Sequence, residues 1–175
     1  VRSRGLGDVY KRQQELYDWL DAEPQLFHPG DLDYIHSVER ISKLSNVISI
    51  NGGVQLDLMG QENAESTGTR QLSGVGGQMD FLEGAYRSKG GKGFICINSS
   101  RVTKDGERKS NILATIPGGS TISAPRTMIQ YVATEYGIAS LSGKTLRERA
   151  EAMASIAHPD FREQLRAEAN KLMLW

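Results

Sequence analysis

The spacing of apolar residues changes several times along the chain, and this alternation is the strongest constraint on its fold. The first segments have helical spacing, which ends before Pro24 and resumes after Asp31, a residue that can cap the second helix. From residue 47 the period becomes two, and the turn residues Asn51-Gly52-Gly53 predict a β-hairpin over 47–58. Strand and helix patterns then alternate. The sequence therefore predicts an α/β protein in which helices cover a sheet that is at least partly parallel.

The remaining elements follow from the same periodicities. Helices are expected over 14–23, 32–44, 78–88, 145–157 and 160–172, and Pro125 can open a further short one. Strands are expected over 94–97, 112–116, 121–123 and 132–134. Pro159 separates the last two helices, where His158 is expected to be a capping residue and Asp160 can cap the second helix.

The composition excludes several classes of protein. The 175 residues include 21 Lys and Arg against 21 Asp and Glu, and this zero net charge offers no general attraction for nucleic acid or an anionic membrane. The single cysteine, Cys96, cannot form an internal disulfide, and no run of about 18 apolar residues is present. His28, His36 and His158 share no metal-ligand spacing. We expect a soluble, cytoplasmic protein without a metal site that binds neither nucleic acid nor membrane.

A glycine-rich loop before the helix at 78–88 is the most informative local feature. Gly74, Gly76 and Gly77 can turn backbone N–H groups toward one point, and the helix dipole adds to them, so the loop can hold an oxyanion or a phosphate. A dinucleotide fingerprint would need a further glycine at Met79 and a preceding strand. A tight turn that requires positive φ explains the same glycines, and the residues alone leave both interpretations open.

Charged residues elsewhere are weaker candidates. Lys89 and Lys92 lie on a glycine turn before a strand, where they can meet the phosphates of a nucleotide-like ligand or simply follow a helix end. Glu135 follows a strand at a place where open α/β sheets carry active-site loops, so it is a candidate nucleophile or base, although exposed glutamates are common. Glu62 and Glu65 are expected to be solvated charges in a polar loop.

The first thirteen residues differ from the rest of the chain. They hold four basic residues against one acid and show neither helical nor strand periodicity. The string GLGDVYKRQ within them resembles translated adapter sequence at the ends of assembled reads, so we interpret residues 1–13 as a non-native or disordered segment. The folded domain is therefore expected to span residues 14–175.

Several motifs in a fixed order resemble one known family. They are Ile50-Asn51, LDLMGQ at 56–61, SGVGGQMDF at 73–81, SKGGK at 88–92, TEYGIA at 134–139, GKTLRERAEA at 143–152 and IAHPDFRE at 156–163. With these motifs the chain resembles, from about residue 14 to its end, the acetyl-CoA hydrolase/transferase family. Within this family it looks like the butyryl-CoA:acetate and 4-hydroxybutyrate CoA-transferases.

This resemblance implies a three-layer α/β/α open sheet of the CoA-transferase (NagB/RpiA-like) type, which in the family is the C-terminal half of a longer two-domain chain. Family enzymes carry the acyl group through a glutamate, first as a mixed anhydride and then as a glutamyl-CoA thioester. That glutamate lies upstream of the position of Gln14, so the resemblance places no catalytic nucleophile in this chain. The family's oxyanion-binding loop maps onto Gly74, Gly76 and Gly77.

The resemblance also bears on substrates, partners and further site residues. It implies a coenzyme A thioester and a short carboxylate as substrates, no permanently bound cofactor, a missing N-terminal domain as partner, and a homo-oligomer when the chain is full length. Gln78, Lys89, Lys92 and Glu135 become candidates for contact with substrate or CoA. His36 is a further candidate, since it stands where the family usually has an asparagine.

Two other functions stay open at this point. The same domain can deliver the acyl group to water, which would make the enzyme an acyl-CoA hydrolase. Alternatively, the chain is a noncatalytic, truncated module that keeps only the fold. An intact upstream reading frame that encodes the glutamate would argue against the second alternative.

Overall fold

The computed structural model describes residues 14–172, so the interpretation of residues 1–13 lies outside the described residues. The chain divides into two compact units between Ile35 and His36. The first unit carries α1 (Gln14–Ala22), the 3₁₀ helix η1 (Pro24–Leu26) and α2 (Leu32–Ile35). The predicted cap of α2 is present, because Asp31 Oδ1 accepts a hydrogen bond of 2.8 Å from the Tyr34 N–H.

The helix predicted over 32–44 is divided in two. Helical structure resumes in the second unit as α3 (Val38–Lys43), where the Ser37 hydroxyl accepts a hydrogen bond from the Arg40 N–H. A serine side chain that bonds the backbone in this way begins a new helix and ends the previous one. α3 packs on α4 (Gln78–Arg87), where Gly84 leaves the room that Ile41 occupies.

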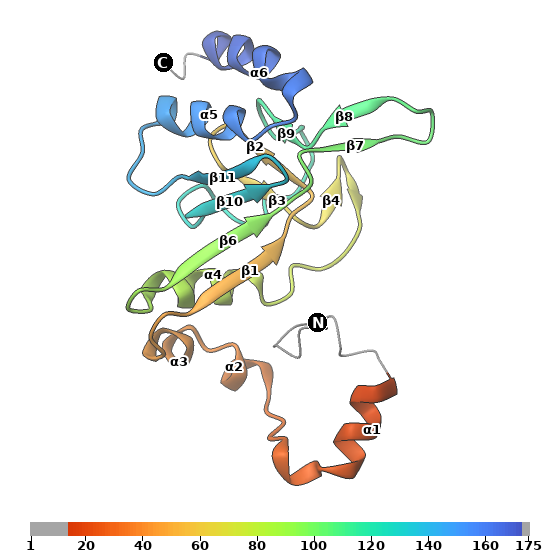
Figure 1. The fold of residues 1–175 in the computed structure, drawn as a ribbon, viewed down its shortest axis with the longest axis vertical. Helices are drawn as coiled ribbons and strands as arrows, with labels where there is room; N and C mark the ends of the chain where they lie inside the picture. The colour runs from red at the N-terminus through yellow and green to blue at the C-terminus, as the bar shows by residue number, and fades with distance from the viewer. Residues whose placement is uncertain (1–13, 173–175) are drawn as a thin grey trace. The chain divides into compact units, whose positions relative to one another are not determined.

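The main sheet of the second unit has the strand order β1, β6, β10, β11 (Figure 1). Its strands are β1 (Ile48–Gly52), β6 (Lys92–Cys96), β10 (Tyr131–Thr134) and β11 (Gly137–Ser140). β1, β6 and β10 are parallel neighbours, whereas β10 and β11 form an antiparallel hairpin. The predicted α/β class, with an open and partly parallel sheet, is confirmed.

The hairpin predicted over 47–58 is wrong. β1 pairs with β6, whereas β2 (Gln55–Asp57) belongs to a second sheet, in which it lies between β3 (Glu62–Asn63) and β9 (Ile112–Leu113). The Gly53 N–H still donates to Cys96 O, and the next N–H, of Val54, donates to Asn63 O. Gly52 and Gly53 lack the positive φ that a tight hairpin turn requires, so the chain passes from one sheet into the other.

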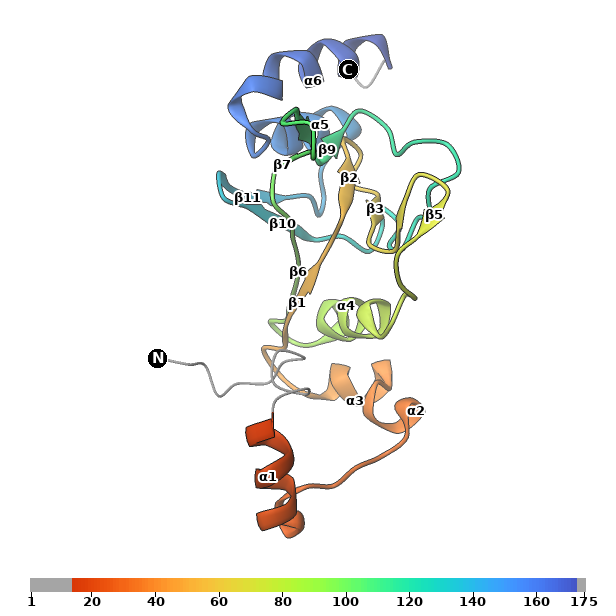
Figure 2. The same ribbon diagram turned by 90° about the vertical axis from the view of Figure 1, so that its right-hand side faces the viewer.

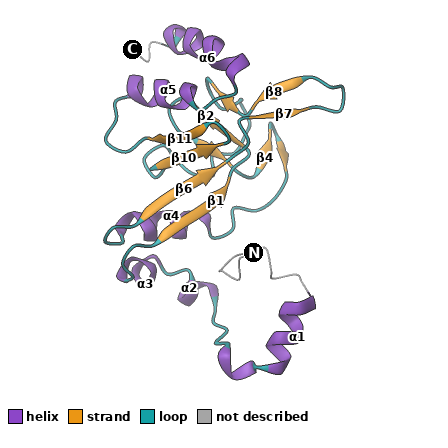
Figure 3. Cartoon of the chain, viewed as in Figure 1, coloured by secondary structure: helices purple, strands orange, loops and turns teal. Residues whose placement is uncertain are grey.

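Short elements complete the second unit (Figure 3). Two small antiparallel ladders pair β4 (Ser66–Thr67) with β5 (Arg70–Gln71) and β7 (Ser100–Val102) with β8 (Arg108–Ser110). The strand expected at 121–123 is a loop that joins β3 through one bridge, between Glu62 and Ala124. The helix expected after Pro125 is only a turn, closed by a hydrogen bond from the Met128 N–H to Pro125 O.

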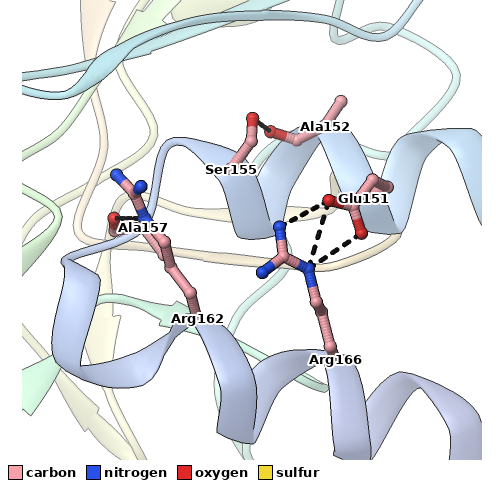
Figure 4. A network of polar contacts seen from close by, with 6 residues as sticks. All are labelled: Glu151, Ala152, Ser155, Ala157, Arg162 and Arg166. Atoms are coloured by element: carbon pink, nitrogen blue, oxygen red, sulfur yellow. Dashed lines mark hydrogen bonds and ion pairs between the residues drawn. The ribbon is translucent and has the colours of Figure 1, made fainter.

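Two helices end the described chain, α5 (Leu146–Ser155) and α6 (Pro159–Lys171). His158 caps α6 as predicted, because its Nδ1 accepts a hydrogen bond from the Asp160 N–H. Asp160 is therefore inside the first turn and is not the cap. Figure 4 shows α5 and α6 joined by Arg166, which bonds both carboxylate oxygens of Glu151. None of the helices in residues 14–172 is long and apolar enough to cross a membrane.

The two faces of the main sheet differ in burial. Ile95, Val132 and Ala139 are cross-strand neighbours on one face and are almost completely buried. Figure 2 shows α4 beside β1 and β6, and Leu82 of α4 is part of the same core. On the opposite face, Ile50 and Ile138 are 68% and 64% exposed. The main core of the second unit therefore lies on one side of this sheet.

Candidate functional site

The glycine loop leads directly into α4 and is open to solvent. Gly77 is the N-cap residue of α4, and no side chain of residues 14–172 caps the N–H groups of the first helical turn. Gly74 and Gly76 are exposed, and a Cβ on either residue would meet no atom of the described residues within 4 Å. Uncapped N–H groups at a helix N-terminus attract anions, so an oxyanion or a phosphate can approach the loop.

The backbone also explains part of the glycine pattern. Gly76 has φ of +61°, a conformation that side chains disfavour. Backbone hydrogen bonds hold the start of the loop, since Glu65 O accepts from the N–H groups of Leu72 and Ser73. Gly74 has no positive φ and, within the described part of the chain, no close neighbour, so the tight turn alone gives no reason for a glycine there.

His36 lies against the glycine loop. Its imidazole occupies the space that a Cβ on Gly77 would need, and it contacts the ring of Phe81 edge-on at 4.9 Å between centroids. His36 Nδ1 is 4.0 Å from Asp80 Oδ2 and, within the described residues, has no hydrogen-bond partner. The structure thus brings together two of the predicted site features, the histidine and the glycine loop.

A buried carboxyl group lies next to the start of α4. Gln78, the first residue of α4, donates a hydrogen bond from Nε2 to Glu62 Oε2. Glu62 is 0% exposed. Burial, reinforced by the charge of Glu65, raises the pKa of Glu62 to about 8, although the hydrogen bond from Gln78 opposes the shift. Glu62 is therefore largely a neutral acid at neutral pH.

Glu65 is also buried and bonded. Its Oε2 accepts a hydrogen bond of 2.6 Å from the Ser123 hydroxyl, and its Oε1 accepts one from Gln71 Nε2. The prediction that Glu62 and Glu65 are solvated is therefore wrong. Their segment has no apolar periodicity, and the groups that bury them come from residues far away in the sequence, so no local pattern could have identified them.

Comparison with known proteins identifies the family. Residues 13–169 match the acetyl-CoA hydrolase/transferase C-terminal domain. The chain belongs to this family. It is 44% identical over 162 residues to the butyryl-CoA:acetate CoA-transferase of Anaerostipes caccae, covering 93% of this chain and 36% of that protein. It is 46% identical over 158 residues to the 4-hydroxybutyrate coenzyme A transferase of Clostridium kluyveri, covering 90% of this chain and 36% of that protein.

A solved structure has the same fold. RipA from Yersinia pestis matches with a TM-score of 0.80 and 38% identity, over 93% of this chain and 36% of that protein. The resemblance inferred from the motifs is therefore confirmed. This acetyl-CoA hydrolase/transferase C-terminal domain spans about a third of the length of the relatives that it matches.

The two lysine candidates of the domain lie away from the glycine loop. Lys89 and Lys92 are exposed and flank a turn in which Gly90 has φ of +76°. They follow the C-terminus of α4, whose ten residues correspond to about 15 Å. The structure therefore places them at the opposite end of α4 from the loop, and their contact with CoA stays a prediction.

Glu135 of the domain bonds the segment after β6. Its carboxylate accepts hydrogen bonds of 2.9 Å from the Ser99 N–H and 2.6 Å from the Ser99 hydroxyl. Desolvation opposes ionisation of Glu135, but these hydrogen bonds outweigh it and lower the pKa of the carboxylate. A low pKa suits a nucleophile better than a base. The same two bonds also give Glu135 a structural role, so its contact with substrate stays a prediction.

Proposed function

We propose that this domain is the C-terminal part of a CoA-transferase. The enzyme would move CoA between a short-chain acyl-CoA, such as butyryl-, acetyl- or 4-hydroxybutyryl-CoA, and a carboxylate such as acetate. The observation that carries the proposal is the exposed glycine loop at the uncapped N-terminus of α4. The names of the relatives supply the substrate class.

The proposed chemistry uses a carboxylate from the part of the enzyme outside this chain. That carboxylate attacks the thioester carbonyl, the C–S bond breaks, CoA leaves as the thiolate, and a mixed anhydride forms. The thiolate then attacks the enzyme's carbonyl in the anhydride, which releases the first carboxylate and leaves an enzyme-bound CoA thioester. Each attack creates a tetrahedral oxyanion, and the N–H groups near Gly74, Gly76 and Gly77 would stabilise it.

Several further features belong to the same proposal. Coenzyme A thioesters act as substrates, and the reaction needs no resident cofactor. The partner of this domain is the N-terminal part of the same enzyme, and the full-length protein forms a homo-oligomer. The single cysteine is consistent with a reducing, cytoplasmic location.

Substitution of Gly74 by alanine in the full-length enzyme tests the role of the loop. Position 74 has open space and no positive φ, so the melting temperature should not change. If the acyl group or its oxyanion approaches the loop, the new methyl group should displace it. Loss of one oxyanion donor lowers kcat by about 10²- to 10³-fold, and a fall of this size with KM little changed is expected. A variant with the kcat of the parent would contradict the proposal.

Two further assays address the alternatives. The family description includes hydrolases, so the products must be measured: release of free CoA and butyrate without formation of acetyl-CoA from acetate would make the enzyme a hydrolase. We also expect the 175-residue chain alone to transfer no CoA, because the proposed nucleophile lies outside it. Activity of the isolated chain would show that the nucleophile lies within it and would make Glu135 the candidate nucleophile. A full-length enzyme without either activity would favour the noncatalytic module.

A further inference from the structure

We propose that Glu62 is a positioning residue for the glycine-loop site, because its buried carboxyl group fixes the amide of Gln78 at the N-terminus of α4. The inference rests on the proposed function of that loop. Glu62 reaches no substrate itself in this proposal. It acts through Gln78, which directly follows Gly77.

The backbone of Glu62 is firmly held. Its N–H donates to Ala124 O at 3.0 Å, and its carbonyl oxygen accepts hydrogen bonds from the N–H groups of Ser123 and Ala124. Glu62 also pairs with Leu56 of the neighbouring strand β2. The 123–124 segment and β2 thus hold the backbone of Glu62 in place, and its side chain extends toward α4.

The two carboxyl oxygens of Glu62 have different surroundings. Oε2 accepts the hydrogen bond from Gln78 Nε2. Oε1 is buried and has no hydrogen-bond partner in the described part of the chain. Oε1 occupies space that a side chain at position 53 would need. A Cβ on Gly53 would be 2.8 Å from Oε1 and 2.9 Å from a methyl group of Ile97. A proton on Oε1 leaves Oε2 free to accept from the amide.

The charges around Glu62 favour this neutral form. Glu65 is the charged group that acts on it, and a second carboxylate disfavours ionisation. The groups that contact Glu62 from α4, from the end of β1 and from the 123–124 segment are uncharged: Gln78, Gly53, Ser123 and Ala124. No cation from the described residues compensates a negative charge there. Ionisation would therefore favour local opening, which releases Gln78 and the start of α4.

The predicted pH dependence has a definite sign. The pKa of Glu62 is raised by folding, so its contribution to stability is fully present below the ordinary glutamate pKa of 4.5 and is lost as pH rises through about 8. The alkaline limb of kcat/KM for the full-length enzyme should then contain an apparent pKa near this value. Glu62→Gln cannot ionise, and its amide oxygen can still accept from Gln78. This variant should keep its activity to higher pH.

The experiment compares full pH profiles of the parent, Glu62→Gln, Glu62→Leu and the control Glu65→Gln. Glu65 is the matched control because it is a buried neighbouring carboxyl group whose partners are Ser123 and Gln71. We expect the limb near pH 8 to disappear in Glu62→Gln. In Glu65→Gln it should persist but move to lower pH, because the charge of Glu65 helps to raise the pKa of Glu62. Glu62→Leu should lower kcat by about fivefold to tenfold at neutral pH, because one positioning hydrogen bond is lost. A Glu62→Gln profile that superimposes on the parent's would overturn the proposal.

A double-mutant comparison separates positioning from general stability. If Glu62 acts through Gln78, adding Glu62→Leu to Gln78→Ala should cause no further loss of kcat, whereas additive losses would contradict the mechanism. Melting temperatures of the 175-residue chain from about pH 6 to about pH 9 provide an activity-free measurement, in which the parent should lose stability and Glu62→Gln should not. If the proposed function is wrong, no transferase activity is seen, but the parent and Glu62→Gln still differ in how their melting temperatures depend on pH. Equal melting curves would overturn the assignment of Glu62.

Discussion

Replacement of Arg149 should destabilise the protein more than removal of any exposed ion pair. The Arg149 side chain of α5 is 8% exposed, and its guanidinium donates to three backbone carbonyls. Nε donates to Met59 O at 2.7 Å, Nη1 to Leu141 O at 2.8 Å and Nη2 to Arg126 O at 2.7 Å. Arg149 thus joins α5 to three separate segments of the second unit.

The expected loss follows from these three bonds. A hydrogen bond from a charged donor contributes about 1.5 to 3 kcal/mol, and buried carbonyls that lose their partner carry an additional desolvation cost. Part of this loss of stability is offset, because burial of the charged guanidinium is itself unfavourable and the substitution removes that cost. The same desolvation lowers the pKa of Arg149. We therefore expect Arg149→Met to lower the free energy of unfolding by roughly 3 to 5 kcal/mol.

Urea denaturation followed by far-UV circular dichroism gives the measurement. The matched control is Arg166→Met on α6, which removes the Glu151 partner shown in Figure 4. Because Arg166 and Glu151 are 41% and 49% exposed, solvent screening limits their pair to about 0.2 to 1 kcal/mol. An Arg149→Met loss below about 1 kcal/mol, no larger than that of the control, would refute the assignment of Arg149 as a buried anchor.

Three further predictions concern single small groups. Gly60→Ala should lower the melting temperature, because φ is +87° and the new Cβ would lie 2.7 Å from both Arg149 Nη2 and a methyl carbon of Leu141. An unchanged melting curve would contradict this conformation of Gly60. Gly77→Ala should displace the His36 ring and cost about 1 to 3 kcal/mol in urea titrations, whereas equal stability would show that the ring can move freely. Cys96 should react with iodoacetamide more slowly than a free thiol at neutral pH, because burial raises its pKa; equal rates would count against its burial.

The elements with strong local patterns could be predicted from the sequence. α4, α5 and α6 lie within one or two residues of their expected bounds, since an amphipathic period and capping groups are both encoded locally. Strand pairing could not be predicted in the same way. The two segments of the expected hairpin pair with β6 and β9, and their partners are set by tertiary packing rather than by the Asn51-Gly52-Gly53 turn pattern.

The candidate site was only partly accessible from the sequence. The glycine loop has a local pattern, whereas His36 became a candidate only through the family resemblance, and no sequence pattern indicated that it lies against the loop. The burial of Glu62 depends on Gln78, sixteen residues further along, and on the 123–124 segment. A carboxylate in a polar stretch is usually solvated, so only the packed structure reveals that this one is not.

The open face of the main sheet has a consequence for work with this chain in isolation. β1 is an edge strand that pairs only with β6 within residues 14–172, and Ile48 and Ile50 on it are more than half exposed. An unprotected edge beside exposed isoleucines is a template for intermolecular strand addition and aggregation. A lysine in place of Ile50 would supply the charge with which natural edge strands resist such association, and it leaves the buried face of the sheet untouched.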